Sequence, residues 1–340
     1  MTPQQPPQLA ELQDLLDGAP RQAEVSVVCQ VEAAGRTFPV YAVALGNRSP
    51  DAPAVGFFGG VHGLERIGAD VVIGYLRNVL NRLPWDNLLA LQLERMRMVF
   101  MPIVNPGGLW LGTRANPQGV DLMRNAPVDS VDAPPAMLGG QRLSARLPWY
   151  RGALGAPMEA ESLAVCRVVE AELLSHAFSL SVDCHSGFGV RDRIWFPYAH
   201  TAQPVAHLAE LHAFSQVLDR GHPHHRYVFE PQSHQYLAHG DLWDHLYALS
   251  CTRGQGVFLP LTLEMGSWLW VRKNPRQFLS RHGFFNPLIQ HRQERVLRRH
   301  LGGLDFVARA AWSHDRWLPA GDARASHREQ ALDLWYRGAR

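Results

Sequence analysis

Lysine is almost absent from this 340-residue chain: Lys273 is the only one, and arginine carries nearly all of the positive charge. The two signs nearly balance, with 33 basic residues against 31 acidic ones and a net charge of +2. Such a balance gives no reason to expect binding to nucleic acids or to membrane surfaces. No apolar run reaches the roughly 18 to 20 residues that a membrane-spanning helix needs. We therefore predict that neither nucleic acids nor membranes are partners.

Cysteine is also scarce, with four residues far apart and no CxxC pair: Cys29, Cys166, Cys184 and Cys251. This spacing excludes a disulfide framework and favours small buried side chains in a reducing compartment. The first 18 residues lack a charged segment followed by an apolar one, so they do not predict a secretory signal. We expect a cytoplasmic protein.

No low-complexity tract interrupts the chain, and 46% of its residues are hydrophobic, enough for a sizeable core. Short apolar runs alternate with helical patterns, which predicts an α/β sheet covered by helices. The predicted strands are 24–31, 37–45, 54–60, 97–104, 178–184 and 257–263. The predicted helices are 66–83, 158–176, 203–219, 239–249 and 286–312. We expect residues 126–156 to form a long surface loop. We also expect a catalytic domain over 1–271, with a helical extension over 272–340 packed on it.

Polar side chains follow three of these strands. His62 and Glu65 stand where the strand 54–60 ends and a helix begins, three residues apart and so on one face of a turn. An imidazole nitrogen and a carboxylate oxygen can then converge on one ion. The alternative is that Glu65 is only a helix-start acid favoured by the helix dipole.

A second strand end, "FSLSVDCHSGFG", supplies Asp183 and His185. His185 would complete a set of two histidines and one glutamate, which is typical of catalytic zinc sites that keep their fourth position open for water. Asp183 is a candidate hydrogen-bond partner for a metal-binding histidine.

The third strand end is "GVFLPLTLEMGSW", where Glu264 follows a run that should be buried. Beside a zinc site this carboxylate could take a proton from water and return it to a leaving amine. Arg114 and Arg124, in a turn-rich segment between the first two strand ends, suit an oxyanion or a substrate carboxylate. The alternatives are a structural ion pair for Glu264 and solvated surface positions for the two arginines.

Together these segments resemble the M14 family of zinc carboxypeptidases. The matching pieces lie between residues 54 and 268, in the order of the family: "HGLE", "NPGG…GTRANPQGVDLMRN", "YRG…MEAES", "DCHSG" and "LTLEMGS". The resemblance implies a three-layer α/β/α fold with a mixed, mostly parallel sheet and one Zn²⁺ ion. It implies His62, Glu65 and His185 as metal ligands and Glu264 as general base. It also implies Arg114 as the group that stabilises the oxyanion, and Arg124 as the group that holds the terminal carboxylate of the substrate.

Two features depart from the family. Met123 stands where the family usually has an asparagine beside the carboxylate-binding arginine, and Asn125 does not restore that donor. The family also has a mobile tyrosine that closes over the substrate. The segment "HGDLWDHLYALS" resembles its surroundings and makes Tyr247 the candidate, with packing on a helix face as the alternative. Arg253 could favour an acidic substrate side chain.

Three other patterns give weaker indications of function. We interpret the histidine-rich segment 222–225 as a solvated loop, because no carboxylate or cysteine stands at ligand spacing. The helix around "HRQERVLRRH" is expected to be amphipathic, with its arginines facing water. Trp268 and Trp270 more often indicate packing than a carbohydrate platform.

The sequence therefore predicts a zinc hydrolase that cleaves an amide bond near the carboxyl end of a peptide. One alternative is a zinc deacylase of small N-acyl amino acids, of the aspartoacylase and succinylglutamate-desuccinylase type. A second is a zinc-dependent protein that binds peptide termini without cutting them.

Overall fold

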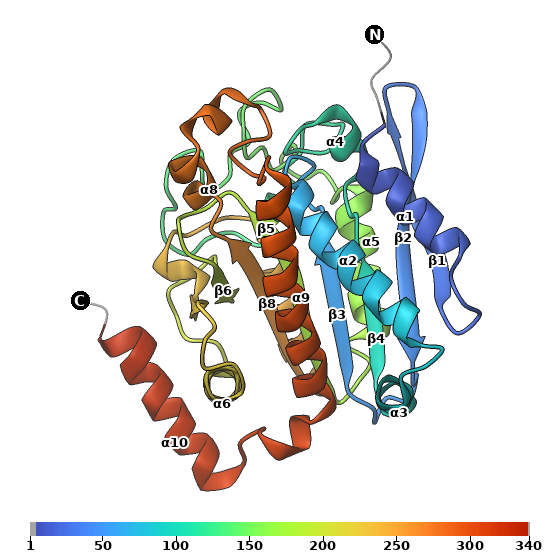
Figure 1. Cartoon of the computed structure of the whole chain (residues 1–340). Coiled ribbons are helices and arrows are strands. Elements are labelled where there is room, and N and C mark those ends of the chain that lie inside the picture. The colour runs from blue at the N-terminus through green and yellow to red at the C-terminus, as the bar shows by residue number, and fades with distance from the viewer. Residues whose placement is uncertain (1–4, 339–340) are drawn as a thin grey trace.

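The computed structural model describes residues 5–338, which form an eight-stranded mixed sheet covered by helices on both faces (Figure 1). The strands are β1 Glu24–Ala33, β2 Arg36–Gly46, β3 Ala54–Gly59, β4 Arg97–Met101, β5 Phe178–Ser186, β6 Arg193–Phe196, β7 Val228–Pro231 and β8 Val257–Met265. Their order across the sheet is β1-β2-β4-β3-β5-β8-β6-β7. The central strands β4, β3, β5 and β8 are parallel, whereas β1, β2 and β6 pair antiparallel with their neighbours towards the centre. The mixed, mostly parallel sheet predicted from the resemblance is confirmed.

The helices are α1 Pro7–Asp17, α2 Arg66–Arg82, α3 Asn87–Arg95, α4 Pro106–Leu111, α5 Ala160–Glu172, α6 Leu208–Gly221, α7 Leu242–Arg253, α8 Trp268–Lys273, α9 Gln290–Trp312 and α10 Gly321–Leu332. All five predicted helices and all six predicted strands are present. The prediction missed β6 and β7, which have four residues each and are too short to show a period. It also missed the helices α1, α3, α4, α8 and α10. In α10, Ala331 alone is buried and no apolar stripe marks the helix.

The sheet is buried on both faces, and every residue of its central strands β3, β4 and β5 is buried. In β3, Phe57 belongs to the core under α2 and α9, and Phe58 belongs to the core under α5 and α7. Figure 1 shows the same layering, with α2 and α9 in front of the strands and α5 behind them. This is the three-layer α/β/α arrangement.

The segment after residue 271 shares this core. Val296, Leu304 and Val307 of α9 pack in the cluster that also holds the apolar face of α2. Helix α10 packs against α6, where Arg324 Nε pairs with Glu210 Oε1 at 2.6 Å. The domain boundary at residue 271 stays a prediction. Among the described residues, no helix combines the length and apolar character needed to cross a bilayer.

Candidate active site

The chain leaves β3 through a tight turn that places His62 and Glu65 just before α2. Gly60 has φ +62°, a left-handed conformation that glycine adopts without strain. Gly68, in the first turn of α2, has no room for a side chain, because a Cβ there would lie 2.2 Å from the Cys184 carbonyl oxygen. These glycines let the start of α2 approach the end of β5, where His185 lies.

A residue from the C-terminal segment fixes the same turn. The side-chain oxygen of Asn286 accepts a hydrogen bond from the Ile67 N–H at 2.9 Å. Its side-chain nitrogen donates to the Leu64 carbonyl at 2.8 Å. Because these bonds bracket Glu65, the segment after residue 271 helps to position a candidate ligand. The sequence analysis did not predict this role, since nothing in the spacing links Asn286 to the turn.

His62, Glu65 and His185 converge as predicted. Nδ1 of His62 lies 3.0 Å from Glu65 Oε1, and Nδ1 of His185 lies 3.2 Å from both His62 Nδ1 and Glu65 Oε2. One ligand atom from each residue lies within 4.8 Å of the other two, and all three residues are buried. Within residues 5–338 this is the group of histidine, cysteine and acidic side chains close enough to hold a metal ion.

The outer nitrogen of each imidazole is held by a buried carboxylate. His185 Nε2 lies 2.6 Å from Asp183 Oδ2, and His62 Nε2 lies 3.1 Å from Asp121 Oδ1. With Nε2 committed in this way, both Nδ1 atoms face the common centre, as is usual for metal-binding histidines. The contact predicted for Asp183 is present. Asp121 was missed, although it stands inside the quoted motif "GVDLMRN", because 59 residues separate it from His62.

The charges of this cluster suit a divalent cation. Burial would lower the pKa of His185, but the Asp183 and Glu65 carboxylates outweigh it and hold that pKa well above its usual range. Burial would raise the pKa of Glu65, but His62, His185 and Arg114 hold it well below its usual range. A protonated His185 thus balances the neighbouring carboxylates, and a metal cation could supply this positive charge in its place. Two imidazole nitrogens and one carboxylate, buried with their outer atoms fixed, fit zinc.

Glu264 lies beside this cluster without belonging to it. It pairs with His185 in the register of β8 on β5, and its Oε1 accepts a hydrogen bond from the Phe188 N–H at 3.0 Å. Burial, reinforced by the nearby charge of Glu65, raises the pKa of Glu264 to about 8. A buried carboxyl group with a raised pKa is suited to exchanging protons near neutral pH.

The cluster opens into a cavity of about 410 Å³, which Trp268 at the start of α8 also lines. The cavity is lined by the three candidate ligands, Glu264, Arg114 and Arg124, and by Met123, Leu138, Trp149, Phe188, Trp195, Tyr236, Trp268, Phe284 and Phe285. Leu138 and Trp149 come from the long irregular loop predicted over 126–156. The predicted ligands, base and arginines therefore meet at one largely aromatic cavity.

The two arginines are held differently. Arg114 donates through Nε to Asp121 Oδ2 at 2.9 Å and through Nη1 to Glu65 Oε1 at 2.8 Å. Arg124 is buried, donates through Nη1 to the Met123 carbonyl, and keeps an Nε without a hydrogen-bond partner among the described residues. Its guanidinium lies over the ring of Tyr236, 5.7 Å from the centroid. A buried guanidinium with an unmatched donor suits a substrate anion.

The structure does not bring Tyr247 to this cavity. Tyr247 is 1% exposed in the core, with its hydroxyl 3.0 Å from the His207 backbone nitrogen. This corresponds to the helix-face packing that was the alternative for this residue. The tyrosine that lines the cavity is Tyr236, eleven residues earlier, and it stands beside the same quoted segment. The choice was wrong because spacing alone cannot separate two tyrosines on either side of the start of α7.

The structure also shows where Asn125, Arg253 and the two tryptophans lie. Asn125 does not face the substrate region: its side chain bonds the Arg151 carbonyl and the Glu159 N–H. Arg253 lies outside the cavity lining and pairs with Glu170, so it gives no support to an acidic preference. Trp270 is buried by packing, whereas Trp268 lines the cavity.

A sequence model described as zinc carboxypeptidase, peptidase family M14, matches residues 13–268. The chain belongs to this family. Carboxypeptidase SOL1 of Arabidopsis thaliana is 25% identical over 114 residues, which are 33% of this chain and only 23% of that protein. Family membership supports the prediction of a zinc metallopeptidase.

Solved structures agree with the fold. Bovine thrombin-activatable fibrinolysis inhibitor, in complex with tick carboxypeptidase inhibitor, has a TM-score of 0.64 at 18% identity and covers 90% of this chain and 97% of that one. Carboxypeptidase A of Helicoverpa armigera has a TM-score of 0.53 at 17% identity, over 87% of this chain and 71% of that one. At these identities the likeness concerns the fold alone.

Replacing Asp183 by asparagine is expected to weaken zinc binding about 10- to 100-fold, the usual cost of removing a carboxylate behind a metal-binding histidine. The amide keeps the size of the side chain but holds the His185 ring less firmly and makes it a weaker donor to the metal. Competition with a chromophoric chelator measures the affinity. As a matched control, Asp86→Asn at the N-terminal cap of α3, where asparagine can also serve as the cap, should leave zinc affinity unchanged. Equal affinities in Asp183→Asn and wild type would show that Asp183 does not orient the ligand.

Proposed function

We propose that the protein is a zinc-dependent metallocarboxypeptidase that hydrolyses the last amide bond of a peptide. The observation that carries this proposal is the convergence of His62, Glu65 and His185 within 4.8 Å at a cavity that Glu264 and Arg124 also line. These three residues would hold one zinc ion. Binding alone needs no buried proton acceptor at the same place, so Glu264 argues against a protein that only holds peptide ends.

When bound, zinc would polarise the scissile carbonyl and increase the acidity of a water molecule. Glu264 accepts the proton of the attacking water and delivers it to the nitrogen of the leaving amine. Arg114 donates to the carbonyl oxygen as negative charge develops on it. Support for this role comes from its anchoring: Asp121 and Glu65 fix Nε and Nη1, and Nη2 has no hydrogen bond within residues 5–338.

Arg124 binds the terminal carboxylate of the substrate, and Tyr236 closes over it. Burial removes competing water from the guanidinium, which strengthens an ion pair with the substrate. Met123 adds no donor, so the carboxylate depends on Arg124 more than it would on an asparagine–arginine pair. Because aromatic side chains line so much of the cavity, we expect apolar residues to be preferred at the end of the peptide.

The missing donor at Met123 also favours the second candidate, a zinc deacylase of small N-acyl amino acids. Such an enzyme would act on a short substrate that fills the cavity without an extended peptide on the acyl side. A panel of an N-blocked dipeptide, a longer peptide and an N-acetyl amino acid, each ending in phenylalanine, separates the two functions. Faster turnover of the N-acetyl amino acid than of either peptide would select the deacylase.

Replacing Arg124 by alanine is expected to lower kcat/KM for peptides with a free carboxyl terminus about 10- to 100-fold. This loss corresponds to a charged hydrogen bond of about 1.5–3 kcal/mol. The matched control is the same peptide with an amidated terminus, on which wild type and Arg124→Ala should turn over at equal, low rates. A variant that keeps the wild-type preference for the free acid would remove Arg124 from carboxylate binding.

A further inference from the structure

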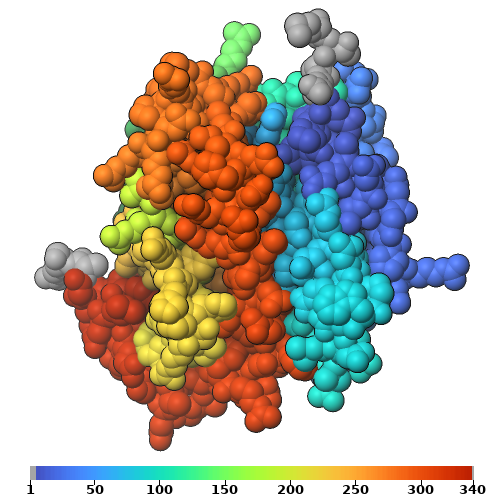
Figure 2. All heavy atoms as spheres, viewed as in Figure 1, coloured from blue at the N-terminus to red at the C-terminus, as the bar shows by residue number. Residues whose placement is uncertain are grey.

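Two segments with no part in the proposed reaction meet on the surface of the protein. One is the histidine-rich loop after α6, and the other is the basic stretch of α9. The ring of His222 packs against Phe306 of α9 with centroids 4.9 Å apart. Figure 2 shows the yellow segment of α6 and its following loop beside the orange-red surface of α9. Between them lies a groove of about 640 Å³, larger than the cavity at the zinc site.

The charged side chains that line this groove are all basic. It contains three histidines, the arginines Arg226, Arg295, Arg298 and Arg299, and no carboxylate. The whole chain is close to neutral, with a net charge of +2. The groove therefore concentrates positive charge that the composition does not reveal.

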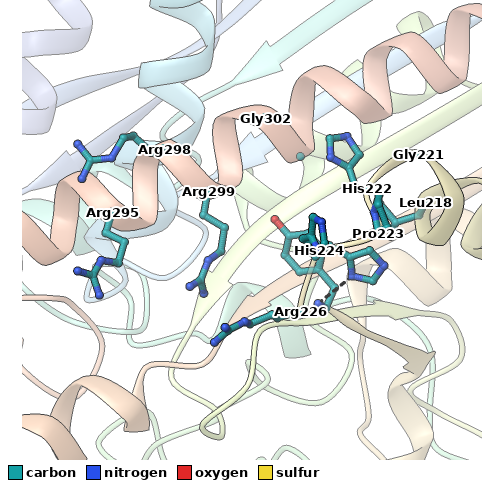
Figure 3. A pocket seen from close by; sticks show the side chains of 13 residues that line it. Leu218, Gly221, His222, Pro223, His224, Arg226, Arg295, Arg298, Arg299 and Gly302 are labelled. Carbon is teal, nitrogen blue, oxygen red and sulfur yellow. Dashed lines mark hydrogen bonds between the residues drawn. The ribbon is translucent and has the colours of Figure 1, made fainter.

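The arginines do not all point the same way. Figure 3 shows Arg295 and Arg299 leaving α9 on one side, with Arg226 reaching towards Arg299 from the loop, whereas Arg298 points away. Arg299 Nη1 is held by Asp192 Oδ2 at 2.5 Å. Neither Arg226 nor Arg295 forms an ion pair within residues 5–338. Arg226 and Arg295 thus have no carboxylate partner, whereas two other lining residues do: Arg299 pairs with Asp192, and His225 Nε2 lies 2.8 Å from Asp219 Oδ1.

The helix also carries a glycine at the groove that packing does not explain. Glycine in the interior of a helix lowers its stability. Gly303 has a packing reason, since a Cβ there would lie 2.9 Å from the Tyr227 hydroxyl. Gly302 has none, because a Cβ there would meet nothing within 4 Å. The absent side chain at Gly302 keeps the groove open beside the arginines.

We propose that this groove binds a small anion carrying several phosphoryl groups. Guanidinium forks match phosphoryl oxygens in pairs, and several separate guanidiniums suit an anion with more than one phosphoryl group. The volume lies in the range of small-molecule sites. Nucleic acid is the less suitable ligand, because the charge is confined to one hollow of a nearly neutral chain and does not extend along a face.

The test is calorimetric titration of the zinc-loaded protein with inorganic tripolyphosphate, ATP and orthophosphate at 150 mM NaCl. Tripolyphosphate is expected to bind at least tenfold more tightly than orthophosphate. Binding of ATP as tight as that of tripolyphosphate supports recognition of the phosphates alone, and tighter binding of ATP supports a nucleotide as the source of the phosphates. Arg226→Gln and Arg295→Gln should each weaken tripolyphosphate binding about 10-fold or more, as expected for lost charged hydrogen bonds.

Two further variants keep this test decisive. Arg298 borders the groove, but its guanidinium points away from it and lies 3.8 Å from Glu294 Oε2, so Arg298→Gln removes the same charge from the same helix and should change the affinity less than threefold. Gly302→Gln fills the groove without changing its charge and favours the helix, so it should fold and lose most of the binding. No binding, or equal losses in the Arg295 and Arg298 variants, would overturn the proposal. Binding that no groove variant weakens would place the anion on the zinc ion and would overturn the proposal. A 20-nucleotide single strand that binds more tightly than tripolyphosphate, with an affinity that Gly302→Gln leaves unchanged, would identify nucleic acid as the ligand and would also overturn the proposal.

Discussion

Replacing Glu264 by glutamine is expected to lower kcat about 10²- to 10⁴-fold while leaving zinc bound, because a general base contributes acceleration of this order. The amide has nearly the same shape, and its oxygen can still accept the hydrogen bond from the Phe188 N–H. It cannot take a proton from water. Steady-state kinetics on a peptide with a C-terminal phenylalanine, together with zinc analysis of the dialysed protein, measure both parts of the prediction.

The same variant has a distinctive effect on the metal-free protein. The pKa of Glu264 is raised to about 8 by burial and by Glu65, so the folded protein holds this proton more tightly than the unfolded chain, in which the group titrates near 4.5. This group therefore costs stability as the pH rises from about 4.5 to 8. Glutamine removes the cost, so metal-free Glu264→Gln should melt no lower than wild type at pH 8. Glu264→Asp, which keeps a shortened carboxylate, should recover part of the activity. Activity above a tenth of wild type in the glutamine variant would exclude Glu264 as the base.

The candidate zinc site could be predicted because its residues follow strands that the sequence marks clearly. β3, β5 and β8 are almost entirely buried, and parallel strands deliver their carboxyl ends to one edge of the sheet. His62, Glu65, His185 and Glu264 all stand at such ends. Their convergence therefore required only the strand pattern and the order of the motifs.

The surroundings of the site could not be predicted in the same way. Asp121 contacts His62, and Asn286 contacts the backbone on either side of Glu65, both from irregular segments where no periodicity fixes the direction of a side chain. Tyr236 and Tyr247 both flank the start of α7, and only the path of the chain decides which of them lines the cavity. Contacts that depend on loop geometry follow from tertiary packing, which local sequence does not encode.

The charged groove shows the same limit on a larger scale. Taken separately, a histidine-rich loop and a basic helix were each consistent with solvated surface. They lie about 70 residues apart in the chain, and only the packing of α6 against α9 places them on two sides of one hollow. Neither segment has a pattern that predicts the other as its neighbour.

Replacing His185 by glutamine is expected to remove zinc and activity together, in contrast to the Glu264 variant. If the roughly 10–16 kcal/mol of a four-ligand zinc site is shared evenly, one ligand contributes on the order of 3 kcal/mol, or roughly 100-fold in affinity. Dialysis against a chelator followed by zinc analysis and a peptide assay measures the loss. His291→Gln, an exposed change on α9, is the matched control and should retain both metal and activity.

The pH dependence of zinc binding separates a lost ligand from a disturbed fold. In the metal-free protein Asp183 and Glu65 hold the pKa of His185 well above its usual range, so zinc must displace a proton from this imidazole. Affinity should therefore fall as the pH is lowered from 8 to 6, by about tenfold per pH unit for each proton displaced. In His185→Gln one such proton is gone, so the slope of log affinity against pH should be smaller by one. A variant that binds zinc as tightly as wild type, with the same slope, would mean that His185 is not a ligand, and the hydrolytic mechanism would lose its metal centre.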